Sequence, residues 1–511
     1  MKEPAPGRKT SPPGIRKGLL VSATLSLSVV AVLLFSLVFH VSNRPMQPLR
    51  ERQPGMDQTG NSVSDQPQSS LALGKLITAP ASNGVHSDTE PTNSQSGSPV
   101  ALDKPVSAPG TPLADAGDWP QFRGPKGDGV FSGTLNINRH WGGGLPATLW
   151  DVELGEGYAG AAVRAGRVYV LDYDATNHAD ALRCLSLADG REIWRFAYPV
   201  KIKRNHGMSR TTPAVTEQYL VSFGPKCHVV CLDTASGHFR WGLDLVRDFG
   251  AEVPQWYAGQ CPLIVDGCVI LGVGGNSLLL KVDCATGKTL WSTPNEHSWK
   301  MTHSSVVPLE FAGRRMYVYC ASGGVVGVSA DDGSVLWETD QWKISIATIA
   351  TPVPVGNGKI FLAGGYNSGS LMLQLKEVAG RIVAEPLFRL KPTEFGATQQ
   401  TPIFYQDHLY GVRPDGQLTC LDLAGKVLWS SGAGAKFGLG PFLIANGLIL
   451  VLNDDGLLTL AEAAPLGYHA LAQAQVLAGH DAWAPMALAG GRLLARDLTR
   501  MVCLDITTDK K

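Results

Sequence analysis

The stretch from Cys231 to Trp241 reads CLDTASGHFRW, and close copies of its pattern recur along the C-terminal three quarters of the chain. The pattern is an apolar pair and an acid, then Gly, three residues and Trp. Copies end at Trp194, Trp291, Trp337 and Trp429, and a truncated copy is Cys503-Leu504-Asp505. The chain has six Gly-x-x-x-Trp pairs, where its 58 Gly and 12 Trp in 511 residues would give about 1.4 by chance. The pattern is therefore an internal repeat.

Each repeat contains only β-rich segments. In the period around the quoted stretch, turn residues separate the short runs 212–215, 219–223, 228–232 and 238–241. Asp233 can accept backbone N–H bonds and Gly237 supplies a positive φ, so the residues between them predict a tight hairpin. A period of roughly 40 to 50 residues with four strands predicts one blade of a β-propeller.

The fourth strand of each blade is expected to carry a large side chain that packs between neighbouring blades. Eight positions fit this role: Trp150, Trp194, Trp241, Trp291, Trp337, Phe388, Trp429 and Leu471. The segment 145–154 has no preceding three strands, whereas the last period, 482–506, lacks a fourth strand. We therefore predict an all-β, eight-bladed propeller of four-stranded antiparallel blades, closed by pairing of these two segments. Seven blades are the alternative, because the fifth and seventh periods are degenerate.

The composition fits a large globular domain without a polyanionic partner. The chain is 44% hydrophobic and 17% charged, and its 44 Lys+Arg balance its 44 Asp+Glu. A nucleic-acid-binding protein would ordinarily show a basic excess, so no nucleic acid is expected as a partner. The predicted partner is another protein or a component of the cell envelope.

An apolar segment near the N-terminus predicts a membrane anchor. Residues 18–41 carry no charged side chain and are long enough to span a bilayer as one helix. The preceding tail, 1–17, carries five Lys or Arg residues, which places it in the cytoplasm. We therefore expect a single-pass protein of a bacterial inner membrane, with its C-terminal domain in the periplasm or another extracytoplasmic space. A cleaved signal peptide is the alternative.

Between the anchor and the propeller lies a segment of different composition. Residues 42–117 are rich in Ser, Pro, Gln, Asn, Thr and Gly, with few aromatic residues, and predict a disordered linker. The propeller is expected over 118–508. It opens with Asp118-Trp119-Pro120-Gln121-Phe122-Arg123-Gly124-Pro125, which indicates a segment packed onto the propeller or, alternatively, a ligand contact by Arg123.

The cysteines and motifs do not indicate a catalytic centre. Nine Cys are present, and Cys184, Cys231, Cys420 and Cys503 occupy the same position in four blades, as small buried hydrophobic residues would. No disulfide is expected. Zinc spacings, a haem-attachment motif, an EF-hand loop and a phosphate-binding loop are absent from the sequence. We accordingly predict no catalytic residues and no metal site.

A ligand site would lie where the chain leads into the inner strands, because these segments converge on the propeller axis. Aligned on the recurrent Pro, the candidates form a polar ring with an aromatic wall, a common setting for a small ligand. They are Arg210, Thr211, Gln260, His303, Gln399, Gln400 and Trp483. A polar, water-filled channel mouth is the alternative. His206 and Trp256-Tyr257, just outside these positions, would shape a lid or a docking rim.

Residues 118–506 resemble the pyrroloquinoline-quinone (PQQ) type of propeller repeat, found in quinoprotein alcohol dehydrogenases and in the outer-membrane assembly lipoprotein BamB. For a dehydrogenase, this resemblance implies bound PQQ with calcium. However, this chain has no adjacent Cys pair, and the calcium ligands and catalytic Asp of that family match no motif here. The first Cys is Cys184, so the lipid anchor of BamB is also missing.

Two functions therefore remain for the sequence. The first is a non-enzymatic, membrane-anchored scaffold with the architecture of BamB and no cofactor. The second is a PQQ-dependent oxidoreductase or a small-ligand sensor that binds its ligand at the propeller axis.

Overall fold

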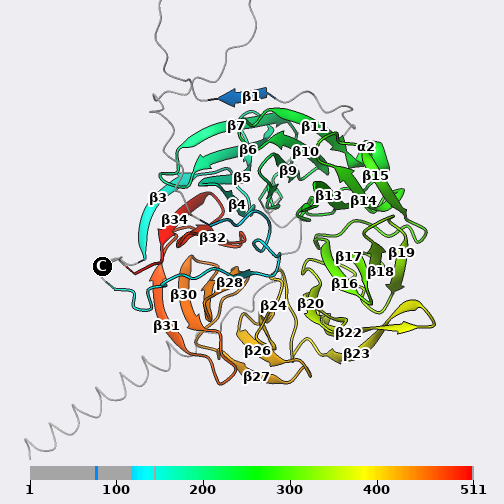
Figure 1. The fold of residues 1–511 in the computed structure, drawn as a ribbon. Helices are drawn as coiled ribbons and strands as arrows, with labels where there is room; N and C mark the ends of the chain where they lie inside the picture. The colour runs from blue at the N-terminus through cyan, green and yellow to red at the C-terminus, as the bar shows by residue number, and fades with distance from the viewer. Residues whose placement is uncertain (1–74, 79–116, 143–145, 206, 509–511) are drawn as a thin grey trace, which may run out of the picture. The chain divides into compact units, whose positions relative to one another are not determined.

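The predicted strands form eight sheets in the computed structural model of the chain, which describes residues 75–78, 117–142, 146–205 and 207–508. The sheets are arranged around one axis, each with one strand near the axis and one at the rim (Figure 1). Each contains four antiparallel blade strands, which are consecutive in the chain in seven blades, whereas the eighth blade combines β3 with β32, β33 and β34; the eight-bladed propeller is therefore confirmed and seven blades are excluded.

The strands occupy equivalent places in all blades. The innermost strands are β4 (Ala161–Arg164), β8 (Ala214–Val215), β12 (Leu263–Val265), β16 (Val307–Phe311), β20 (Val353–Gly356), β24 (Ile403–Tyr405), β28 (Phe442–Ala445) and β32 (Ala487–Ala489). The second strands are β5 (Arg167–Asp174), β9 (Tyr219–Phe223), β13 (Cys268–Gly272), β17 (Arg314–Ala321), β21 (Lys359–Gly364), β25 (His408–Val412), β29 (Leu448–Leu452) and β33 (Arg492–Arg496).

The outer half of each blade follows the same order. The third strands are β6 (Ala179–Ser186), β10 (His228–Asp233), β14 (Ser277–Asp283), β18 (Gly324–Ser329), β22 (Gly369–Val378), β26 (Leu418–Asp422), β30 (Leu457–Glu462) and β34 (Arg500–Asp505). The outermost strands are β7 (Glu192–Pro199), β11 (Phe239–Asp244), β15 (Thr289–Pro294), β19 (Val335–Thr339), β23 (Arg381–Leu390), β27 (Val427–Ser430), β31 (Ala470–Gln475) and β3 (Ala147–Glu153). A short helix, α2 (Leu245–Phe249), follows β11 and is capped by the Asp244 side chain.

The ring is closed as the sequence predicted. Strand β3 pairs antiparallel with β34, from Ala147 opposite Asp505 to Glu153 opposite Arg500. The N-terminal strand thus supplies the outermost strand of the eighth blade. This pairing leaves no unpaired sheet edge at the point where the two ends of the ring meet.

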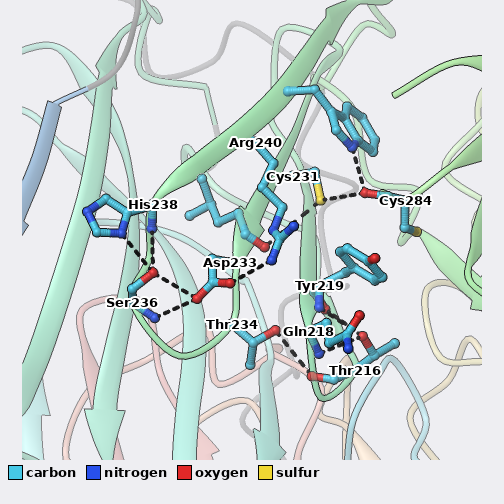
Figure 2. A network of polar contacts seen from close by, with 12 residues as sticks. Thr216, Gln218, Tyr219, Cys231, Asp233, Thr234, Ser236, His238, Arg240 and Cys284 are labelled. Carbon is cyan, nitrogen blue, oxygen red and sulfur yellow. Dashed lines mark hydrogen bonds and ion pairs between the residues drawn. The ribbon is translucent and has the colours of Figure 1, made fainter. Parts of the chain in front are cut away.

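The hairpin of the repeat is held by its acid, as Figure 2 shows for the second blade. Asp233 Oδ1 accepts hydrogen bonds from the backbone N–H and the hydroxyl of Ser236, at 2.9 and 2.7 Å. Asp233 Oδ2 accepts one from Arg240 at 2.7 Å. Burial alone would raise the pKa of Asp233, but these bonds lower it to about 2. The acid of the repeat therefore acts as a local turn residue.

The Trp and Gly of the repeat meet across blade boundaries. Trp241 donates its indole N–H to the Cys284 carbonyl of the next blade at 2.8 Å. Its ring lies against Gly287, where a Cβ atom would come within 2.7 Å of Trp241 Cγ. Trp150 and Trp291 contact the equivalent Gly190 and Gly333 in the same way. The repeat Gly thus provides both the positive φ and the space for the preceding blade's Trp.

Residues 117–131, which we call the clasp, connect opposite sides of the ring. Trp119 pairs with Val163 of the first blade, and the Val215 N–H of the second blade donates to the Pro120 carbonyl at 2.8 Å. Arg123 donates to the carbonyls of the sixth blade's Thr401 and Pro402, at 2.7 and 2.9 Å. Strand β2 (Val130–Phe131) pairs in parallel with β28 of the seventh blade. These contacts agree with the interpretation of this segment as packed onto the propeller.

The predicted tail 1–17, the predicted membrane helix 18–41 and most of the predicted linker 42–117 lie outside the described residues. Within that linker, residues 75–78 form strand β1 (Lys75–Thr78), which pairs antiparallel with β7. No helix in the described part of the chain combines the length and the apolar character needed to cross a membrane.

Candidate functional site at the propeller axis

The loops between blades place the predicted site residues at one end of the propeller. Because every blade is an antiparallel meander, the loops from an outermost strand to the next innermost strand share one face with the loops between second and third strands. We call this the crossover face. Each predicted site residue precedes an innermost strand and therefore belongs to a crossover loop.

A ladder of hydrogen bonds joins the innermost segments below this face. Four bonds connect five successive blades, and in each a backbone N–H donates to the side chain at the equivalent position of the next blade, over 2.9–3.4 Å. The residues are Thr212, Cys261, Ser305, Thr351 and Thr401. The ladder ends at Thr401, whose carbonyl accepts the bond from Arg123. The axial positions of the second to sixth blades are thus fixed relative to one another.

Two of the predicted residues are bonded inside their own blades. The Thr211 hydroxyl donates to the Phe223 carbonyl at 2.6 Å. The Gln260 side chain makes two bonds with the backbone of Gly272, at 2.6 and 3.1 Å, and is fully buried. Both side chains therefore join first and second strands of a blade and do not face the axis with free polar atoms.

The glutamines of the sixth blade differ from each other. Gln400 Nε2 donates to the carbonyls of Gly438 and Gly440 in the next blade, both at 3.0 Å, whereas its buried Oε1 has no partner. Gln399 is half-buried beside it. Gln400 thus bridges two blades where glycine replaces the ladder side chain.

Arg210, by contrast, lies among aromatic rings. Its guanidinium carbon is 5.5 Å from the centre of the Tyr158 ring, and Nη2 donates to the carbonyls of Asn205 and Gly207, at 2.8 and 3.4 Å. The buried Nε has no hydrogen-bond partner. Burial lowers the pKa of Arg210 to about 10, so the side chain remains charged at neutral pH.

His303 lies close to Arg210 and against Trp256. The two ring centres of His303 and Trp256 are 6.3 Å apart. Burial, together with the charge of Arg210, lowers the pKa of His303 to about 4, so the imidazole is neutral at pH 7. The buried Nε2 has no hydrogen-bond partner, whereas the Tyr257 backbone makes a hydrogen bond with the ring.

Two aromatic pairs flank these groups. Trp256 is stacked on Tyr366 of the fifth blade, with ring centres 6.4 Å apart and an interplanar angle of 11°. Trp483 of the eighth blade lies 5.0 Å from Tyr158, and its indole N–H donates to Asp454 Oδ1 at 2.7 Å. We call the set the axial cluster, and its members are Tyr158, Arg210, Trp256, His303, Tyr366 and Trp483.

The sequence reasoning missed Tyr158 and Tyr366. Tyr158 precedes β4, but the first blade has Gly160 where other blades have the Pro used for alignment. Tyr366 lies in the turn between the second and third strands of the fifth blade, whereas all the predicted site residues precede innermost strands. One signal points to it: Tyr366 and Asn367 both have positive φ, 51° and 62°, a conformation that bulky residues rarely adopt. His206 lies outside the described residues.

The described residues contain no cluster of acidic, imidazole and thiol side chains of the kind that holds a metal ion. Calcium requires several oxygen ligands, yet no three Asp, Glu, His or Cys side chains come together among the residues in the described ranges. The nine Cys, all within the described part, are free and buried, and burial raises the pKa of Cys261 to about 11. The axial cluster offers one half-buried cation, one unprotonated imidazole nitrogen and two aromatic surfaces.

Comparison with known proteins identifies relatives of the fold. A family model for outer membrane protein assembly factor BamB matches residues 178–425. No curated protein sequence matches significantly. A europium-containing methanol dehydrogenase is 13% identical with a TM-score of 0.54, covering 74% of this chain and 89% of that one.

Two further solved structures are similar. A quinohemoprotein alcohol dehydrogenase from Pseudomonas putida HK5 is 12% identical with a TM-score of 0.53, covering 78% of this chain and 81% of the other. BamB from Moraxella catarrhalis is 14% identical with a TM-score of 0.49, covering 70% and 99%. At these identities the likeness concerns the fold alone.

Proposed function

Since this chain is a PQQ-like β-propeller, we propose that it is a membrane-anchored, extracytoplasmic scaffold that binds another protein or a cell-envelope component through its crossover face. The observation that carries the proposal is the set of partly exposed aromatic side chains on this face, fixed to a closed ring. Trp256, Tyr366 and Trp483 are all half-buried, and Ile346 on a nearby crossover loop is 52% exposed. Rigidly held aromatic residues are the side chains that contribute most to protein interfaces.

A site-specific photo-crosslinker tests which surface binds a partner. Ile346 and Leu290 are equally exposed, at 52% and 54%, but Leu290 lies on the outermost strand β15. With the full chain expressed in its own host, we expect one discrete crosslinked product from position 346 and none from position 290. Equal products from both positions, or none from either, would refute binding through the crossover face.

The membrane part of the proposal is supported by the sequence of residues 18–41 alone. We expect the full chain to remain in the membrane fraction after carbonate washing, and a chain lacking residues 18–41 to become soluble. In a variant whose propeller is unfolded, protease added from the periplasmic side should digest the propeller and leave residues 1–17 intact. Recovery of the full chain in the soluble fraction would contradict the anchor.

A second candidate is a small-ligand sensor, and Arg210 is the observation that favours it. Its half-buried guanidinium contacts backbone carbonyls and an aromatic ring, and no described carboxylate forms an ion pair with it. This candidate does not exclude the first, because a scaffold can recognise its partner through the same group.

A further inference from the structure

Arg210 is half-buried and lacks the acid that lies near other enclosed arginines of the propeller; Arg123, for example, has Asp128 nearby. Arg183 pairs with Asp172 and Glu192, at 3.1 and 2.6 Å. Arg496 lies in the field of two acids, and Arg413, on the crossover face of the sixth blade, pairs with Asp415. A charge taken out of water is costly unless an opposite charge compensates it. Among the described residues no carboxylate pairs with Arg210, which contacts only two backbone carbonyls and the Tyr158 ring, so the position suits an anion from outside the chain.

The neighbouring imidazole is held so that one of its nitrogens is buried without a hydrogen-bond partner. Gly259 leaves the space that the His303 ring occupies, because a Cβ atom at 259 would come within 2.6 Å of His303 Cδ2. The Tyr257 backbone engages the ring, which leaves Nε2 without a partner. A polar nitrogen that is buried and unpartnered loses hydrogen-bond energy unless a ligand or water contacts it. Arg210 and His303 thus have unmet bonding capacity beside each other.

The charge and shape of the cluster select among anions. Arg210 is the one cation of the cluster, and Asp481 and Asp454 are bonded to two of its other members. One guanidinium can pair with one carboxylate, whereas a phosphate dianion would require further cations. The aromatic pairs Tyr158–Trp483 and Trp256–Tyr366 supply apolar surfaces for the body that carries the anion. A guanidinium is also well suited to a carboxylate, because its parallel N–H groups match the two oxygens.

We propose that the axial cluster is a receptor for a carboxylate group on an apolar or aromatic body, with Arg210 as the charge partner and His303 Nε2 as the second contact. The proposal rests on the crossover face being the binding face, and it names the chemistry that is recognised there. The carboxylate can belong to the end of a partner protein or to a small organic acid, and the two sources are distinguishable.

Binding is expected to be coupled to proton uptake. The titratable groups around His303 are Arg210, Tyr158, Tyr257 and Tyr366, with Asp481 bonded to Tyr158 and Asp454 bonded to Trp483. A carboxylate placed beside the imidazole raises its pKa above the ligand-free value of about 4. Protonation converts Nε2 into a donor to the ligand. Affinity should therefore increase as the pH falls from 7 to 5.

Calorimetric titration of the full chain in detergent tests the proposal. Benzoate should bind and benzamide, its uncharged counterpart, should not. Arg210→Gln should weaken benzoate binding about tenfold to hundredfold, the usual range for a charge-assisted contact. Arg210→Lys should retain only part of the affinity, because the charge remains but the paired N–H groups are lost. Arg413→Gln, which removes an arginine that already has a carboxylate partner, should leave the affinity unchanged. His303→Gln should abolish the pH dependence.

The possible outcomes separate the two sources and the two proposals. Binding of N-acetylphenylalanine but not of its amide assigns the site to a peptide terminus, whereas binding of benzoate alone assigns it to a small acid. Equal binding of benzoate and benzamide, or of benzoate by wild type and Arg210→Gln, would overturn the receptor. Benzoate binding without any crosslink from position 346 would support the carboxylate receptor and refute the scaffold. A crosslink from position 346 without benzoate binding would support the scaffold and refute the receptor.

Discussion

Two glycines of the third blade allow the packing between blades to be measured separately from backbone strain. Gly267 and Gly287 both have left-handed backbones, with φ of 74° and 72°. Nothing lies within 4 Å of a Cβ atom at Gly267, whereas a Cβ atom at Gly287 would be 2.7 Å from Trp241 Cγ. Alanine at either site therefore suffers the same conformational cost, but only Gly287→Ala collides with the neighbouring blade.

The expected magnitudes follow from these geometries. Gly267→Ala should lower the free energy of unfolding by about 1 kcal/mol, the cost of a left-handed non-glycine residue. Gly287→Ala should lower the free energy of unfolding by about 1–3 kcal/mol more than Gly267→Ala does, because overpacking of a core has this cost. Urea unfolding of the full chain, followed by circular dichroism at equal protein concentration, measures both values.

A double-mutant cycle identifies the contact responsible. In a Trp241→Ala background, which itself should cost about 3–5 kcal/mol, the additional cost of Gly287→Ala should fall to that of Gly267→Ala. If the two glycine variants are equally stable in the wild-type background, the collision is not real. If the excess cost of Gly287→Ala persists without Trp241, the reasoning on blade packing is wrong.

Other groups give independent predictions. Asp180 is fully buried, and burial raises its pKa from 3.8 to about 7. Between these pH values the folded state retains a proton that the unfolded chain has lost, so the free energy of unfolding should fall with rising pH by up to about 4 kcal/mol. Asp180→Asn should remove this pH dependence when urea unfolding is compared at pH 5 and 8. Arg123→Ala should destabilise the propeller by about 2–4 kcal/mol and expose the clasp to limited proteolysis, since four bonds from a buried guanidinium to backbone carbonyls are lost; an unchanged cleavage pattern would argue against the clasp. All nine thiols are buried, so a thiol reagent should label none in the folded chain and nine after unfolding, and labelling of Cys268 alone would indicate local opening.

The propeller itself could be predicted from the sequence, because its determinants are local and repeated. The acid and Gly of the hairpin, the alternation of apolar residues and the Trp at the fourth strand recur in most periods and specify a blade without knowledge of the others. The closure also followed, since a lone strand at 145–154 and a missing strand after Asp505 complement each other. The second role of the repeat Gly did not, because its partner Trp belongs to the preceding blade.

The axial cluster depended on the tertiary structure. Successive residues of an extended segment point in opposite directions, so Arg210 and Thr211, adjacent in sequence, differ completely in role: one lies among aromatic rings and the other is bonded inside its blade. Tyr158 and Trp483 come together only because closure of the ring places the first and eighth blades side by side. The sequence by itself determined the blades and their order, since short-range chemistry specifies them, and the closed ring decided which side chains meet at its axis.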